Sequence, residues 1–124
     1  MVTLFFNGQS QHIDSAEALA RALEGFDRHP VFELVCSATH GQALFMLRNG
    51  SEAWLMYLRH DGDSGFHSLG HDDAQGTASF RLSNGQFDDC PRAWCIDLAQ
   101  CYQAVAYFVA HDGGQPGWLR WAQD

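Results

Sequence analysis

Histidine and cysteine side chains give this chain its clearest candidates for metal chemistry. His60, His67 and His71 lie in one segment, and Cys90 and Cys95 follow downstream. Structural zinc sites usually bring their ligands in close pairs such as C-x2-C, whereas four residues separate these two cysteines. We therefore predict no metal site and no cofactor. A metal-using enzyme built on these five side chains remains an alternative hypothesis.

Residues for nucleophilic or acid–base catalysis are present, but they lack a supporting pattern. Ser64 and Ser68 lie close to glycines, yet neither has the G-x-S-x-G spacing that exposes a catalytic serine. The chain has no phosphate-binding or dinucleotide-binding glycine motif. It also lacks the H-x-E and P-C-x-x-C pair of a zinc deaminase. The sequence therefore predicts no catalytic residues and a protein that is not an enzyme.

Acidic residues are the more informative polar feature. The chain carries 15 acidic and 7 basic residues, which gives a net charge of -8. Six aspartates fall in two stretches that read as loops: Asp61, Asp63, Asp72, Asp73, Asp88 and Asp89. Such runs often do no more than keep a surface solvated. The alternative is a patch at one edge of the fold that attracts a basic partner and orients it.

Aromatic side chains beside these acids suggest what could anchor a partner. Phe66 and Phe87 lie within or next to the two acidic stretches, and interfaces depend on a few such buried anchors. Calcium is not expected, because Asp72 stands where an EF-hand loop needs glutamate. The predicted partner-binding residues are Asp61, Asp63, Phe66, His71, Asp72, Asp73, Phe87, Asp88 and Asp89.

The charge and the hydropathy pattern also restrict the possible partners. An acidic protein is repelled by phosphate backbones, so no direct contact with nucleic acid is expected. No segment approaches the roughly 20 apolar residues of a membrane span, and the N-terminus lacks the features of a signal peptide. We therefore expect no membrane association, a cytoplasmic location and four reduced cysteines.

Turn signals and hydrophobic periodicity predict the elements that must position these residues. Helices are expected from an Asp14 or Ser15 cap to about Leu23, closed by Gly25, and from Asp97 to Val109. Strand-length runs occupy 2–6, 9–13, 31–38, 43–48, 53–60, 66–69, 77–82, 87–89 and 118–121. The run at 53–60 is apolar on both faces and is predicted to be the central strand. This order predicts a single α+β domain over 1–124: an antiparallel sheet of about six to seven strands with two helices packed on it.

The last helix and strand are expected to fasten the fold. Asp97 is placed to cap the helix with Gln100 as its reciprocal partner, and Cys101 falls on the apolar stripe. We expect residues 98–109 and the Trp118–Trp121 strand to be largely buried, so that removing the final strand unfolds the protein.

This C-terminal segment also carries a resemblance to a known family. Its features are Tyr107-Phe108 near the helix end, Gly113-Gly114, Pro116 and a closing strand with Trp121. In these it resembles the first immunity-protein family of bacterial polymorphic toxin systems. The AWLMYLRH strand at 53–60 and the acidic glycine-rich loop after it are similar to the family's middle section. Gln115 departs from the pattern, because family members often have arginine there.

The resemblance implies a small cytosolic inhibitor with no chemistry of its own. Its partner would be a cognate toxin domain with a basic cleft, a nucleic-acid deaminase or nuclease. A monomer would bind it in a one-to-one complex and cover its active site. The competing hypothesis is an acidic chaperone or adaptor module that escorts a secreted effector without inhibiting it.

Overall fold

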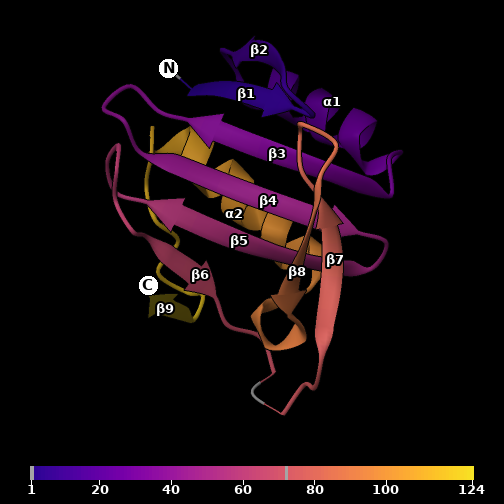
Figure 1. The fold of residues 1–124 in the computed structure, drawn as a ribbon. Coiled ribbons are helices and arrows are strands. Elements are labelled where there is room, and N and C mark those ends of the chain that lie inside the picture. Colours follow the sequence, from indigo (N-terminus) through magenta and orange to yellow (C-terminus); the bar gives the residue numbers. More distant parts are fainter. Residues whose placement is uncertain (1, 72) are drawn as a thin grey trace.

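The computed structural model describes residues 2–71 and 73–124, which form two sheets and two α-helices (Figure 1). The strands are β1 (Val2–Phe6), β2 (Gln9–Ile13), β3 (Val31–Ser37), β4 (Ala43–Asn49), β5 (Glu52–Leu58), β6 (Phe66–Ser68), β7 (Thr77–Arg81), β8 (Phe87–Pro91) and β9 (Trp121–Gln123). The helices are α1 (Ala16–Asp27) and α2 (Leu98–Ala110), with a short 3-10 helix, η1 (Arg92–Trp94), between β8 and α2.

Seven of the strands form one antiparallel sheet in the order β2-β1-β3-β4-β5-β6-β9, and β7 and β8 form a separate hairpin. The α+β prediction is therefore confirmed. The hairpin lies across the face of the sheet opposite α2 (Figure 1), an arrangement that strand-length runs alone do not reveal. The prediction that residues 53–60 form the central strand is wrong, because β4 occupies the middle of the order and β5 lies beside it.

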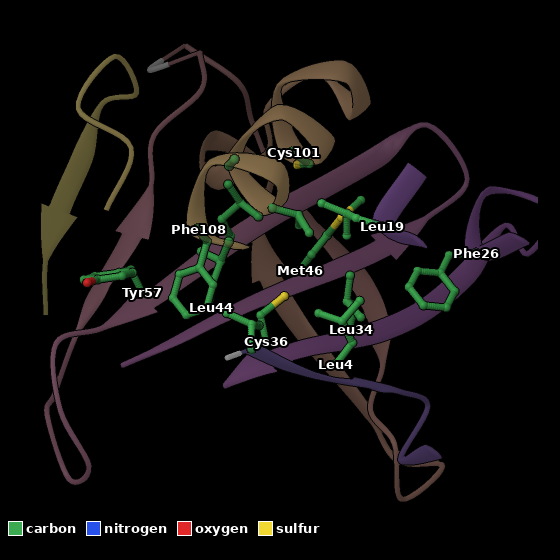
Figure 2. Close-up of a cluster of buried hydrophobic side chains, with 14 of the residues drawn as sticks. Leu4, Leu19, Phe26, Leu34, Cys36, Leu44, Met46, Tyr57, Cys101 and Phe108 are labelled. Atoms are coloured by element: carbon green, nitrogen blue, oxygen red, sulfur yellow. The ribbon is translucent and has the colours of Figure 1, made fainter. Parts of the chain in front are cut away.

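The larger hydrophobic core fills the space between the sheet and the two helices (Figure 2). Alternation along β3 directs Phe32, Leu34 and Cys36 into it, all with no exposed surface. From α2, Cys101 and Phe108 are also fully buried, as the apolar stripe predicts. Complete burial of a side chain such as leucine or phenylalanine stabilises the fold by about 1.5–3 kcal/mol.

A smaller core lies on the opposite face, beneath the β7–β8 hairpin. It contains Leu47, Trp54, Ala78, Phe80 and Cys90. The Trp54 ring contacts the Phe80 ring edge-on at a centroid distance of 6.5 Å, yet its buried Nε1 has no hydrogen-bond partner among the described residues. The hairpin is also tied to the main sheet by polar contacts: the Ser83 amide and hydroxyl donate to the Glu33 carboxylate, and the Asn49 side chain donates to the Ser79 carbonyl. It covers only part of this face.

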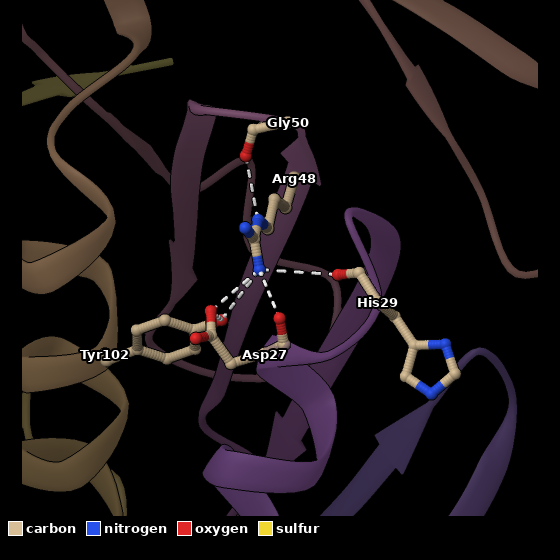
Figure 3. A network of polar contacts seen from close by, with 5 residues as sticks. All are labelled: Asp27, His29, Arg48, Gly50 and Tyr102. Carbon is tan, nitrogen blue, oxygen red and sulfur yellow. Dashed lines mark hydrogen bonds and ion pairs between the residues drawn. The ribbon is translucent and has the colours of Figure 1, made fainter.

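Helix α1 runs further than predicted because its C-terminus is held by Arg48 of β4 (Figure 3). Ser15 caps the helix as expected, its hydroxyl accepting from the Ala18 amide at 3.0 Å. The predicted stop at Gly25 is wrong, since the helix continues to Asp27. There the Arg48 guanidinium donates to the Asp27 carboxylate at 2.8 Å and to the Asp27 carbonyl at 3.3 Å. A cation at a helix C-terminus compensates its unpaired carbonyls.

The same guanidinium joins both helices to the sheet. It donates to the Tyr102 hydroxyl of α2 at 3.3 Å and to the carbonyl of His29 at 3.3 Å. Tyr102 in turn donates to the Asp27 carboxylate at 2.8 Å. Burial, reinforced by that carboxylate, raises the pKa of Tyr102 to about 12, so the phenol remains a donor throughout the physiological range.

Helix α2 begins where predicted, but without the predicted capping box. Asp97 occupies the N-cap position, yet its carboxylate makes no capping hydrogen bond in the described structure. After the helix, Gly113 adopts a left-handed φ of 105° and its amide donates to the Phe108 carbonyl at 2.9 Å. No helix in the described part of the chain is long and apolar enough to cross a membrane.

The two tryptophans of the C-terminal segment differ in burial. Trp121 lies in β9, packs against the larger core and donates its Nε1–H to the Pro116 carbonyl at 2.9 Å. Trp118 lies before the strand and is 50% exposed. The prediction that Trp118 is buried in a final strand is therefore wrong. It contacts Tyr107 edge-on at 5.2 Å instead of entering the core.

We predict that Arg48→Met lowers the free energy of unfolding by about 2 kcal/mol, because several charge-assisted hydrogen bonds are lost together. Urea unfolding measures this change. Arg21→Gln, on the exposed surface of α1, is the control and should change stability by less than about 0.5 kcal/mol. Equal effects of the two substitutions would contradict the proposed role of Arg48.

The tryptophan pair gives a second prediction. Trp121→Ala should cost about 2 kcal/mol, below the ~3–5 kcal/mol typical of a fully buried ring, whereas Trp118→Ala should cost less than about 1 kcal/mol. Thermal and urea unfolding of the two variants test this. A larger loss for Trp118 would show that the C-terminal segment is fastened differently.

Candidate functional site

The first acidic stretch is partly committed to holding its own loop. Asp63 accepts from the Arg59 guanidinium in two hydrogen bonds of 2.9 Å and from the Arg59 amide at 2.9 Å. Its side chain is only 3% exposed. These bonds hold the pKa of the Asp63 carboxyl well below its usual range. Asp61, next to it, is exposed, so only one of these two aspartates faces solvent.

The two candidate aromatic anchors lie in different settings. Phe66 of β6 packs against the larger core on the helix side of the sheet, and the Arg59 guanidinium lies 5.1 Å from its ring centroid. Phe87 of β8 is 62% exposed. Most of the Phe87 ring is therefore accessible to a partner, whereas Phe66 packs inside the protein and stabilises the fold.

The second acidic pair lies on a strand, as the strand-length run at 87–89 predicts. Asp88 and Asp89 belong to β8 and are both exposed. Asp89 pairs with Ser79 across the hairpin and accepts a hydrogen bond from its hydroxyl. Asp88 lies opposite Phe80 in the register. Since Phe80 points into the smaller core, Asp88 shares the sheet-facing side of the hairpin.

The loop from 69 to 76 carries the remaining candidates. His71 and Asp73 are exposed and belong to a turn in which the Ala74 amide donates to the His71 carbonyl at 3.0 Å. Asp72 lies outside the described residues. Gly70 anchors this loop to η1, its amide donating to the Ala93 carbonyl at 2.7 Å. A Cβ at Gly70 would lie 1.8 Å from the Cys95 carbonyl oxygen, so close an approach requires glycine.

Asp61 of the first acidic stretch does not meet the Asp88–Asp89 pair at one edge, contrary to the prediction for these residues. The Asp61 backbone approaches Gly41, just before β4 begins. At the other end of β4, Asn49 donates to the Ser79 carbonyl at 2.8 Å, and Ser79 is the partner of Asp89. The seven residues of β4 span about 20 Å at ~3.3 Å per residue. Asp61 and the Asp88–Asp89 pair therefore lie at opposite ends of the middle strands.

The histidines and cysteines that suggested a metal site are not grouped around a common point in the described structure. Within residues 2–71 and 73–124, no three His, Cys, Asp or Glu side chains are placed to hold a metal ion. His67 bonds to Asp124 at 2.6 Å and stacks on Trp94 at a centroid distance of 4.1 Å. Burial raises the pKa of the Cys95 thiol to about 11 and also raises that of Cys90. Neither thiol is therefore activated as a nucleophile.

Sequence reasoning missed one surface feature, a row of apolar side chains on the sheet face next to the hairpin. Phe5, Val35, Phe45 and Met56 are partly exposed and are direct neighbours across four strands. Their alternation with buried residues could have marked them as a second apolar face. The strand pairing that aligns them could not be read from the sequence.

Comparison with known protein families now places the chain. Residues 12–123 match the model described as immunity protein Imm1. The chain belongs to this family. It is an immunity protein of a toxin system, and its partner is a cognate toxin. No curated protein matches the chain.

The family match confirms the resemblance and extends it well beyond the C-terminal segment. Immunity proteins of this family are generally non-enzymatic, which agrees with the prediction from the missing catalytic motifs. The kind of toxin and the residues that contact it remain predictions.

The Asp63–Arg59 pair gives a prediction about pH. Because the carboxyl pKa is lowered on folding, its stabilisation should be present above the unfolded pKa of about 3.9 and lost as pH falls below it. Asp63→Asn should therefore lower the melting temperature at pH 7, and the difference from the wild type should shrink below about pH 4. Asp61→Asn is the control, with no expected change. A pH-independent difference for Asp63→Asn would contradict this role.

Proposed function

We propose that this immunity protein inhibits a nucleic-acid-directed toxin, most simply a deaminase, by covering its active site or substrate cleft. The net charge of -8 is the observation that carries the proposal. A cleft that binds a polyanion is expected to be basic, so an acidic protein complements it. Because the toxin acts on nucleic acid inside cells, inhibition would take place in the cytoplasm.

Inhibition of this kind needs binding without chemistry. One monomer would occupy one toxin domain, and no cofactor would be required. The exposed carboxylates of Asp61, Asp73, Asp88 and Asp89 would attract a basic cleft over distances of about one Debye length, roughly 8 Å at physiological salt. Such charges mainly accelerate association and fix orientation, while desolvated contacts set the lifetime of the complex.

Protection of cells from the toxin tests the proposal. The cognate toxin domain is produced in the cytosol from an inducible promoter, with or without the immunity protein. Full rescue of growth, together with loss of base deamination in recovered nucleic acid, is expected. A chaperone or adaptor would bind the toxin but leave cells unprotected, so binding without rescue favours that alternative. Rescue without any deamination by the free toxin would point to a nuclease or another activity.

Neutralising the hairpin acids should slow association. The double variant Asp88→Asn/Asp89→Asn is expected to reduce the association rate constant about tenfold at low salt, with little change in dissociation. The difference should nearly disappear at about 0.5 M salt, where screening is strong. Surface plasmon resonance at several salt concentrations measures both rates.

The control for this experiment removes equal charge from another face. Glu17→Gln/Glu24→Gln changes two exposed acids on α1, which lies on the opposite side of the sheet from the hairpin (Figure 1). Association should then slow much less than for the hairpin variant. Equal slowing by the two double variants would mean that net charge matters and the hairpin location does not.

A further inference from the structure

One face of the main sheet carries a continuous cross-strand row of partly exposed apolar side chains. The register places Phe5 beside Val35, Val35 beside Phe45, and Phe45 beside Met56. His67 continues the row on β6. Residues directly opposite each other on neighbouring strands share a face, and all of these side chains are partly exposed.

This row is the uncovered half of an apolar face. In the adjacent positions, Leu47 and Trp54 are 3% and 7% exposed because the β7–β8 hairpin lies over them. Phe45 and Met56 pack against the margin of that smaller core. The other face of the same strands is covered by helices (Figure 2). The apolar surface thus continues out from under the hairpin onto the open part of the sheet.

Acidic groups border this open half on opposite sides. Asp61 lies next to the β4 end marked by Gly41. On the other side, the hairpin holds Asp88 on its sheet-facing surface, and Figure 1 shows β8 on the side of β7 nearer the middle of the sheet. The aspartates that fail to form one cluster therefore frame the apolar row.

We propose that the open half of this sheet face, centred on Val35 and bordered by the Asp61 loop and β8, is the docking surface for the cognate toxin. The inference rests on the proposed function and names its contact face. An apolar centre with a charged rim is the usual anatomy of a specific interface. The acidic rim selects a basic partner, and the apolar row supplies the desolvated contacts that charge alone does not provide.

Two other apolar surfaces in the described structure are alternatives to the sheet face as docking sites. Trp118 is 50% exposed and packs edge-on against Tyr107 near the end of α2. A groove of about 550 Å³ also opens between α1 and α2, lined by apolar residues that include Leu19 and Val109. The groove is also lined by Asp14 and Asp112, but it lies among the helices, on the side of the sheet opposite the acidic hairpin (Figure 1). We assign docking to the sheet face, where the apolar row and the hairpin acids lie on the same side of the sheet.

A matched pair of substitutions tests the assignment. Val35→Arg places a cation in the centre of the proposed surface, and Trp118→Arg makes the same change at the more exposed alternative. Val35→Arg is expected to weaken binding to the purified toxin domain at least about 100-fold, in the range of an interface hot spot, and to abolish growth protection. Trp118→Arg should bind within about threefold of the wild type. Circular dichroism and melting temperature establish that both variants are folded.

Oxidation of the wild-type protein gives a test that does not depend on a folded variant. Met56 belongs to the row and is partly exposed, whereas Met46 is fully buried in the larger core. Hydrogen peroxide should oxidise Met56 in the free protein, and the toxin should slow that reaction at least about fivefold. Met46 serves as the internal control, with little oxidation in either state.

The outcomes distinguish a failure of the proposed function from a failure of the docking surface alone. A wild-type protein that neither binds nor protects against the toxin overturns the proposed function, and the docking assignment with it. A wild type that protects, combined with normal binding by Val35→Arg or unchanged oxidation of Met56, overturns the docking surface alone. Loss of binding by Trp118→Arg with retention by Val35→Arg would transfer the interface to the end of α2.

Discussion

The rest of this structure depends on the middle strands of the sheet being apolar on both faces. In β4, Leu44 and Met46 point toward the helices, while Phe45 and Leu47 point the other way. A sheet built from such strands must bury two surfaces. Two helices cover one face completely enough to leave several side chains without any exposed surface. On the other face, the hairpin formed by two five-residue strands, β7 and β8, covers only one end of the middle strands. The apolar side chains at the uncovered end are available to a partner.

Apolar burial does not by itself determine how the two helices are oriented on the sheet, and polar interactions determine this orientation. Arg48 leaves the helix-facing side of β4 and reaches both the end of α1 and Tyr102 of α2. Its side chain is 11% exposed, and its contacts with Asp27 and with main-chain carbonyls offset the cost of burying the charge. One cation therefore fixes how the two helices sit on the sheet. The hairpin on the opposite face is joined to the sheet by exposed polar contacts, from Ser83 to Glu33 and from Asn49 to Ser79, and the buried Trp54 Nε1 beneath it is without a partner in the described structure.

If the toxin docks on the proposed sheet face, this arrangement separates the residues that stabilise the fold from those that recognise the partner. The helices, the C-terminal strand and the larger core maintain the fold, and none of them needs to change with the toxin. The hairpin and the open half of the sheet can vary in charge and shape at little cost to that core. The Asp63–Arg59 pair holds the loop that carries Asp61, and the Gly70 contact with η1 holds the chain that follows β6. Contacts that fix these loops before binding would reduce the entropy lost when a toxin docks on the proposed surface.

Local sequence patterns were enough to predict the fold class and most of the elements, and the C-terminal motif was enough to predict the family. Alternation and turn residues gave β1 and β2 their correct bounds, because those signals act within a few neighbouring residues. They failed at the end of α1, where Arg48 acts from 21 residues away, and at Trp118, whose exposure depends on where the chain passes after α2. The acidic residues were correctly recognised as exposed for Asp61, Asp73, Asp88 and Asp89, but Asp63 proved to be an internal partner of Arg59. Tertiary structure alone decided that the aspartates lie on two sides of an apolar row. Local sequence sets which face of a strand or helix a side chain takes, whereas only strand pairing and packing decide which faces lie together and which remain uncovered.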